Sequence, residues 1–322
     1  MLTDTGLFQH AQIDETRTWD ALDTFAADSL PDPIRAMLIT PYREIILAGR
    51  DSIEQFERLS SGSIPFFRRW AVEGGIEAPY TLISKDQGIW YVNKQRRFVK
   101  VLGQTPQTYS SDVGTPMEAV DEWDGAWASP LPFQGDEFIL LQAPMATNEY
   151  GTKGLTFLYD IRAKKWSQLF GWDSGSGTPA RWPGWSYMMM WGRHFVGVNG
   201  KVLELTSDVH TNDGETQRML GRTAHFDQWG NSFVNDLRFR LVRGKATQNA
   251  EPGKIMLRVR KNGRQWSNWR AKSLGAAGDT DFFVHFGPQG EALSWQWEWR
   301  VTDDCPVEIV GMWAQVAPAE PG

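Results

Sequence analysis

The sequence contains a single cysteine, Cys305, in 322 residues. One thiol can form neither an internal disulfide nor a cysteine-rich metal cluster, so we interpret Cys305 as a buried or half-buried small side chain. The chain also lacks a run of about 18 apolar residues that would predict a membrane-spanning helix. Its first residues carry acids and lack the apolar core of a secretory signal. These absences predict a protein of an aqueous compartment with no membrane insertion.

An excess of basic residues is lacking too. Asp and Glu number 39 against 33 Lys and Arg, which gives a formal net charge of -6. Nucleic-acid-binding domains normally carry a basic field. The composition therefore excludes a general electrostatic attraction to nucleic acid, and any contact with DNA would have to be local.

Sequence motifs of common enzyme classes are missing. The chain has no G-x-S-x-G nucleophile elbow, phosphate-binding loop or dinucleotide-binding glycine pattern. Its five histidines form no i, i+4 pair and have no neighbouring cysteine, which argues against a metal site. We therefore expect a non-enzymatic protein with no catalytic residues, cofactor or metal. The histidines are His10, His194, His210, His225 and His285.

Tryptophan and glycine are abundant, with 17 and 31 residues. Stiff aromatic strand residues and tight turns are typical of all-β proteins. Four segments combine a β-rich run, a turn with Gly or Asn, and a second alternating run, and we predict a β-hairpin in each. They are Arg43–Glu57, Gly88–Leu102, Phe138–Met145 with Gly154–Gly171, and Arg193–Leu205.

The first two hairpins begin at Ile45 and Ile89, a spacing close to the roughly 40–50 residues of one four-stranded propeller blade. Further along, apolar and polar residues alternate as in half-buried strands. We predict an all-β fold, a β-propeller-like blade array followed by a C-terminal β-sandwich. An irregular array of β-sheets is the alternative to the propeller. The alternating strands are Leu237–Gly244, Lys254–Gly263, Ser294–Val301 and Val307–Val316.

Three regions follow from this pattern. Residues 1–34 are an N-terminal arm or first blade element, 35–215 the propeller-like domain and 216–322 the β-sandwich domain. Within the first region, Thr18–Ile34 is either a short helix, which Pro31 and Pro33 would end, or an extended arm.

A group of carboxylates offers a second interpretation of the propeller. Acids beside aromatic rings are the mixture that a sugar-cleaving cleft uses, and solvated loop acids are the alternative. With Trp182 and Trp185, this group would line the cleft of a carbohydrate-binding or glycan-cleaving protein. Its members are Glu118, Asp121, Glu122, Asp124, Trp123 and Trp127.

Two further groups have both a structural and a functional interpretation. The stripe of Trp295, Trp297 and Trp299 on one strand face fits core packing, or a platform for sugars or bases. The basic residues in turns are either solvated surface residues or, in an oligomeric ring, residues that surround the axis and contact a phosphate backbone. The candidate DNA-channel residues are Lys94, Arg96, Arg97, Lys164 and Lys165, beside Arg162 and a third basic group at Arg258, Arg260, Lys261 and Arg264.

The stretch Gly171–Trp185 is rich in Gly and Trp, and we predict a long exposed loop that contacts a neighbouring subunit or a partner. Its candidate contact residues are Trp172, Arg181, Trp182 and Trp185.

Several segments, in the same order, resemble the packaged-DNA stabilisation proteins of short-tailed bacteriophages, the tail hub or nozzle family. The resemblance covers most of the chain. Family members carry more chain before the Trp19 segment, so a propeller that is smaller, open or completed by a neighbour fits this sequence. The segments are Thr16–Ile34, Arg43–Glu57, Gly75–Val92, Phe157–Leu169 with its Y-D-x-x-x-x-x-W pattern, and Leu257–Gly275 with its Asn-Gly turn and W-S strand.

The resemblance implies a structural virion protein of the tail, assembled in the host cytoplasm. It implies a homohexameric ring below the portal and its adaptor, or head-completion protein, with a tail fibre, tailspike or needle attached. Such a ring retains packaged double-stranded DNA, contacts it transiently and without sequence preference, and forms part of the ejection channel.

Overall fold

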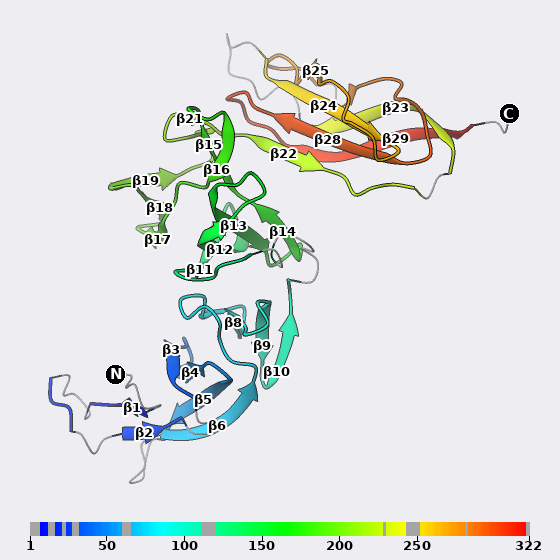
Figure 1. Cartoon of the computed structure of the whole chain (residues 1–322). Coiled ribbons are helices and arrows are strands. Elements are labelled where there is room, and N and C mark those ends of the chain that lie inside the picture. Colours follow the sequence, from blue (N-terminus) through cyan, green and yellow to red (C-terminus); the bar gives the residue numbers. More distant parts are fainter. Residues whose placement is uncertain are drawn as a thin grey trace. The chain divides into compact units, whose positions relative to one another are not determined.

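The computed structural model describes residues 7–11, 17–20, 24–27, 32–59, 66–110, 117, 120–227, 230–242, 252–280 and 283–319. The regular elements with described bounds are the β-strands β1 to β29 (Figure 1). They form a propeller-like blade array followed by a β-sandwich, which confirms the predicted fold class.

The chain divides into two compact units. The first unit is Met1–Phe170 with Thr178–Tyr187, and the second is Gly171–Gly177 with Met188–Gly322. The hairpin at Arg193–Leu205, expected in the propeller-like domain, thus lies in the second unit. The domain limits at residues 34 and 215 stay predictions.

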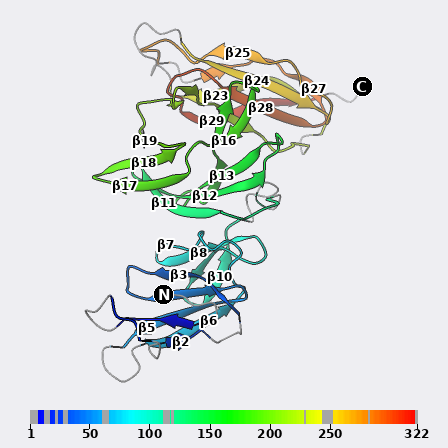
Figure 2. The same cartoon turned by 60° about the vertical axis from the view of Figure 1, so that its left-hand side comes forward.

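The first unit contains a two-stranded ribbon and three antiparallel four-stranded sheets, here called blades 1 to 3 (Figure 1 and Figure 2). The ribbon pairs β1 (Leu7–Gln9) with β2 (Thr24–Ala26). Blade 1 is β3 (Ile34–Ile39), β4 (Ile45–Gly49), β5 (Ser52–Arg58) and β6 (Phe66–Glu73). Blade 2 is β7 (Ile83–Lys85), β8 (Gly88–Val92), β9 (Phe98–Leu102) and β10 (Thr105–Thr108). Blade 3 is β11 (Trp127–Phe133), β12 (Asp136–Thr147), β13 (Lys153–Asp160) and β14 (Lys165–Gln168). Strand β16 (Thr178–Arg181) follows later in the chain.

All four predicted hairpins are present. The turn of the Arg193–Leu205 hairpin uses Asn199 at φ 39° and Gly200 at φ 79°. Two successive residues with positive φ match the twist of a two-residue hairpin, and Asn and Gly tolerate that conformation best. Local sequence therefore determined these turns.

Blade 2 packs between its two neighbours. Its Tyr91 and Val99 share a buried cluster with Ile46 and Ile53 of blade 1. Its opposite face packs on blade 3 in a larger cluster that includes Trp90. Because strand side chains alternate between faces, each blade can bury apolar residues on both sides, as stacked propeller blades require.

The N-terminal arm is extended in its described part. Phe25 of β2 lies 5.6 Å from the Phe8 ring and 5.5 Å from the Phe66 ring, and this aromatic cluster packs on blade 1. A helix over Thr18–Ile34 is therefore wrong for the described residues. Tertiary burial of the aromatic rings overrides the weak helical pattern, and Pro31 lies outside the described residues.

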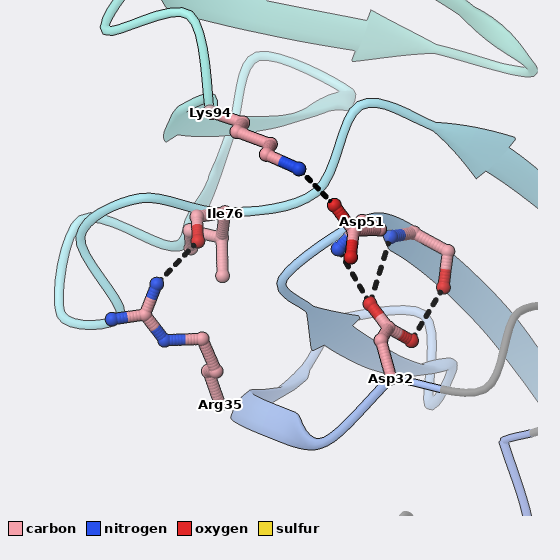
Figure 3. A network of polar contacts seen from close by, with 6 residues as sticks. Asp32, Arg35, Asp51, Ile76 and Lys94 are labelled. Atoms are coloured by element: carbon pink, nitrogen blue, oxygen red, sulfur yellow. Dashed lines mark hydrogen bonds and ion pairs between the residues drawn. The ribbon is translucent and has the colours of Figure 1, made fainter.

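A polar network joins blade 1 to blade 2 (Figure 3). The Asp32 carboxylate accepts hydrogen bonds from the Asp51 and Ser52 backbone N–H groups, at 2.5 and 3.1 Å. Asp51 in turn forms an ion pair with Lys94 of blade 2. Arg35 donates to the Ile76 carbonyl at 3.0 Å, so charged side chains hold two neighbouring turns in register.

This network makes a pH-dependent prediction. The hydrogen bond from Lys94 lowers the pKa of Asp51. A carboxylate with a lowered folded-state pKa stabilises the fold above its unfolded value of about 4, and the contribution is lost as the pH falls through the lower folded value. We expect Asp51→Asn to have a lower melting temperature near neutral pH and a shrinking difference from wild type below about pH 4. Thermal denaturation over a pH series measures this, with the exposed Asp124→Asn as control. An equal difference at every pH would contradict it.

The second unit contains a three-stranded sheet, a small hairpin and the sandwich (Figure 1). The three-stranded sheet is β17 (Ser186–Met190, in this unit from Met188), β18 (Arg193–Val198) and β19 (Lys201–Leu205). The hairpin is β20 (Thr211–Asn212) with β21 (Glu215–Thr216). One sandwich sheet, in the order β22-β28-β24-β25, uses Met219–Arg222, Trp295–Val301, Lys254–Lys261 and Arg270–Ser273. In the other, β23 (Ser232–Leu241) pairs with β26 (Phe283–His285), β27 (Gly290–Ala292) and β29 (Ile309–Pro318). Strand β15 (Phe170–Asp173) precedes them in the chain.

The sandwich core explains the tryptophan stripe. Trp295 and Trp297 are 0% and 1% exposed and pack with Phe239 and Leu257 from both sheets. Trp299 is partly buried against the same core. Core packing is therefore confirmed for the stripe, which is not an exposed stacking platform.

Candidate functional site

The two predicted DNA-channel groups lie in turns of different blades. Lys94, Arg96 and Arg97 occupy the turn between β8 and β9. The Lys94 ammonium is engaged by Asp51, and Arg96 lies 4.0 Å from Glu77. This turn thus contributes to the contact between blades 1 and 2.

Lys164 and Lys165 lie at the other end of the array. Lys164 ends the turn between β13 and β14, and Lys165 is the first residue of β14. In this turn the Ile161 N–H donates to the Glu137 carbonyl at 3.0 Å. Glu137 also pairs with Lys85 at 2.7 Å, which brings the first turns of blades 2 and 3 together. Successive turns of an antiparallel meander alternate between its two ends. The structure therefore places the two basic groups on opposite ends of the blades and does not bring them into one surface.

The carboxylate group does not form a paired acid and base. Asp121 accepts hydrogen bonds from the Thr147 backbone N–H and hydroxyl, both at 2.9 Å, and these bonds lower the pKa of Asp121. A general acid needs a raised pKa, so Asp121 is suited to holding a loop. Glu122 lies 3.8 Å from Lys153, and Asp124 is exposed. Glu118 lies outside the described residues.

The aromatic residues of that group are structural. Trp123 is buried in the core between blades 2 and 3. The Trp127 indole donates to the Gln142 side chain at 3.1 Å, and the fully buried Gln142 donates to the Gly184 carbonyl at 2.7 Å. These rings therefore do not line an open sugar cleft.

The prediction of a long exposed loop over Gly171–Trp185 is wrong, because β15 and β16 occupy much of it. Trp182 is 8% exposed, and a Cβ on Gly184 would overlap its ring, so the glycine lets the chain pass over a buried indole. The Arg181 guanidinium lies 3.2 Å from the centroid of the half-exposed Trp185 ring, and burial lowers the pKa of Arg181 to about 10. Contact of these residues with a partner stays a prediction.

A group of charged side chains and aromatic rings lies on the outer face of the sandwich sheet β22-β28-β24-β25. Glu298 of β28 is 1% exposed and pairs with Arg222 at 2.7 Å and Arg258 at 2.5 Å. The register places these side chains opposite each other on three neighbouring strands. One buried carboxylate thus pairs with two guanidinium groups and neutralises one of their two charges.

Stacked rings extend this face. The Arg258 guanidinium lies 4.8 Å from the Trp266 ring and 4.6 Å from the Trp269 ring, and Arg300 lies 4.2 Å from Trp269. We call Trp266, Arg258, Trp269 and Arg300 the arginine–tryptophan ladder. Cation–π contacts of this kind contribute about 0.5–1 kcal/mol when exposed and roughly 2 kcal/mol when desolvated.

Arg218 lies next to the ladder. Its guanidinium is 3.0 Å from the centroid of the Trp172 ring. Burial and the charge of Arg300 lower the pKa of Arg218. The sequence singled out Trp172 and Arg258 separately, and it contains no local signal that joins them to Arg218, Arg222 and Arg300.

Other site classes receive no support from the described residues. Within them, no group of three or more His, Cys, Asp or Glu side chains is arranged to hold a metal ion. The part of the chain that the structure describes also holds no helix long and apolar enough to cross a membrane.

Comparisons with known proteins include a likeness to a solved structure. No protein-family model and no curated protein matches the sequence. A similar solved structure is an arabinoxylan arabinofuranohydrolase of glycoside hydrolase family 43 from Bacillus subtilis, in complex with cellotetraose. It is 8% identical, the match covers 87% of this chain and 66% of that chain, and the TM-score is 0.26.

This likeness corrects one expectation. The prediction that the chain is not an enzyme is contradicted, because the matched protein is a hydrolase. At this identity and TM-score, the match assigns neither a reaction nor a substrate to this chain.

Proposed function

We propose that the chain is a structural subunit of a short-tailed phage tail, a hub or nozzle ring below the portal and adaptor through which packaged DNA passes. The observation that carries the proposal is the number of blades in the described part of the first unit. Closed propellers have about four to eight blades, whereas the first unit has three four-stranded blades in its described part. Neighbouring subunits can complete such an array, and the order of family-like segments along the chain supports the same assembly.

The net charge of the chain supports the part of the proposal in which packaged DNA passes through the ring. The net charge of -6 suits a conduit that does not hold DNA tightly, while basic groups remain available for local contact. Blades joined by buried clusters and by the Asp51–Lys94 pair give the rigidity that a pressurised channel needs.

A carbohydrate-binding protein is the second candidate, favoured by the outer face of the other sandwich sheet. Trp313 is 42% exposed there and lies 6.2 Å from the Phe283 ring. Arg238 stacks on Phe283 at 4.9 Å, and His285 pairs with Asp236 at 2.7 Å. An exposed ring flanked by polar side chains can stack on a pyranose and hydrogen-bond its hydroxyl groups.

Light scattering separates the two functions. We expect the purified protein to join a portal–adaptor complex as a ring of fixed stoichiometry. The opposite result is a protein that stays monomeric and does not bind the adaptor, and whose migration is retarded in gels containing arabinoxylan through Trp313. That result would favour the carbohydrate-binding function over the tail function. Trp191→Ala, which removes an 82% exposed ring elsewhere in the second unit, is the control for Trp313→Ala.

A further inference from the structure

Two arginines on the outer face of the sandwich sheet lie close together, and among the described residues neither forms an ion pair with a carboxylate. Leu220 of β22 is directly opposite Arg300 of β28. Arg218 precedes Leu220 by two residues, so it is the diagonal neighbour of Arg300, and such neighbours are within reach of long side chains. The fold thus brings two like charges to one end of the arginine–tryptophan ladder.

Among the described residues of the sandwich, the one fully buried carboxylate, Glu298, is already engaged. Its carboxylate forms ion pairs with Arg222 and Arg258. Among the described residues, the Nε atoms of Arg218 and Arg300 are buried and have no hydrogen-bond partner. A buried donor without a partner costs about 1–3 kcal/mol, and more when it is charged. An anion between the two guanidinium groups would remove both this cost and their repulsion.

The stacked rings restrict the class of anion. Arg218 covers the Trp172 ring at 3.0 Å, and Arg258 and Arg300 stack on the Trp269 ring at 4.6 and 4.2 Å. Ring faces occupied in this way are not open to nucleobases or sugars, which bind by stacking. The charged, forked edge of a guanidinium matches phosphate oxygens in bidentate geometry, so a phosphate is the class of anion that fits the two arginines.

We propose that Arg218 and Arg300 form a phosphate-binding site that holds the backbone of double-stranded DNA without reading its sequence. The site deepens the proposed tail function, and the choice of DNA over another phosphodiester polymer rests on that function. Arg222 and Arg258, fixed by Glu298, raise the local positive potential around the site.

Fluorescence anisotropy with a short labelled duplex tests the site. Neutralising one phosphate contributes about -0.9 to the slope of log affinity against log salt concentration. For the double variant Arg218→Gln/Arg300→Gln, we expect a slope flatter by about 1 and affinity about tenfold weaker at low salt. Arg193→Gln/Lys201→Gln removes the same charge from exposed ion pairs of the three-stranded sheet and is the matched control.

Two further results keep the test decisive. Arg218→Lys/Arg300→Lys keeps the charges, so it should retain the wild-type slope while losing affinity with the forked geometry. Equal slopes for the glutamine variant and the matched control would overturn the site, as would wild-type protein that does not bind the duplex.

Assembly of the protein into a ring on the portal–adaptor complex is measured separately from DNA binding. If wild type joins the portal–adaptor complex but does not bind the duplex, the phosphate site fails and the tail function stands. If it binds DNA through Arg218 and Arg300 but never joins the complex, the site stands and the tail function fails.

Discussion

Replacing Trp90 by alanine is expected to lower the free energy of unfolding of the first unit by about 3–5 kcal/mol, the range for removing a large buried aromatic side chain. Trp90 is 1% exposed in the core between blades 2 and 3. Its ring lies 5.5 Å from Phe98, 4.8 Å from Tyr109 and 5.7 Å from Tyr159 of blade 3. The indole also donates to the Lys85 carbonyl at 2.9 Å, so alanine would leave both a cavity and an unpaired acceptor.

Hydrogen exchange resolved by peptide measures this loss without relying on tryptophan fluorescence. Because the chain has two compact units, protection should fall in strands of blades 2 and 3 and stay unchanged in the sandwich strands. Trp19→Ala removes a 43% exposed ring from the same unit and should change stability by less than about 0.5 kcal/mol. A similar loss for both variants would show that the core between the blades does not depend on Trp90.

The sequence predicted local structure well where a turn residue and an alternating pattern occur together. Asn262 at φ 51° and Gly263 at φ 67° form the turn after β24, as the Asn-Gly pair indicates. The alternation of Leu237, Phe239 and Leu241 correctly identified the core face of β23. Such signals lie within a few residues of each other, so no knowledge of long-range contacts is needed.

Edge strands and partly buried segments were harder to predict. Strand β22 lies at the edge of its sheet, with Met219 and Leu220 41% and 42% exposed, so it has no clear alternation of buried and exposed residues. The segment around Trp182 resembles a loop because glycine and proline surround the ring. Its burial depends on the Gln142 hydrogen bond to Gly184, a contact between distant parts of the sequence.

The arginine–tryptophan face could not be assembled from sequence for the same reason. Trp266 and Trp269 follow Arg258 closely, but Arg222 and Glu298 reach them only through pairing of β22 and β24 with β28. A sequence lists charged residues without showing which of them share a sheet face. The register of distant strands decides whether an arginine is solvated or balanced by a buried carboxylate.

Because Glu298 contacts two guanidinium groups, we expect Glu298→Gln to lower the free energy of unfolding strongly as well. Glutamine keeps the size of the side chain and removes the charge that both Arg222 and Arg258 contact. Breaking a buried pair typically costs about 3–5 kcal/mol. We expect roughly 2–3 kcal/mol here, because solvent screens the partly exposed guanidinium groups. Urea unfolding followed by far-UV circular dichroism gives the value for the second unit.

Two comparisons show whether the loss comes from the buried charge. Glu204→Gln removes a carboxylate from an exposed pair with Arg193 in the same unit and should have little effect. Combining Glu298→Gln with Arg222→Gln should cost less than the sum of the single losses, because each removes the other's partner. Strict additivity would mean that the two side chains are not coupled. Coupling would instead identify Glu298 as the residue that holds Arg222 and Arg258 in place. The Glu298→Gln variant should then also bind duplex DNA with an affinity that differs from wild type, although its Arg218 and Arg300 are unchanged.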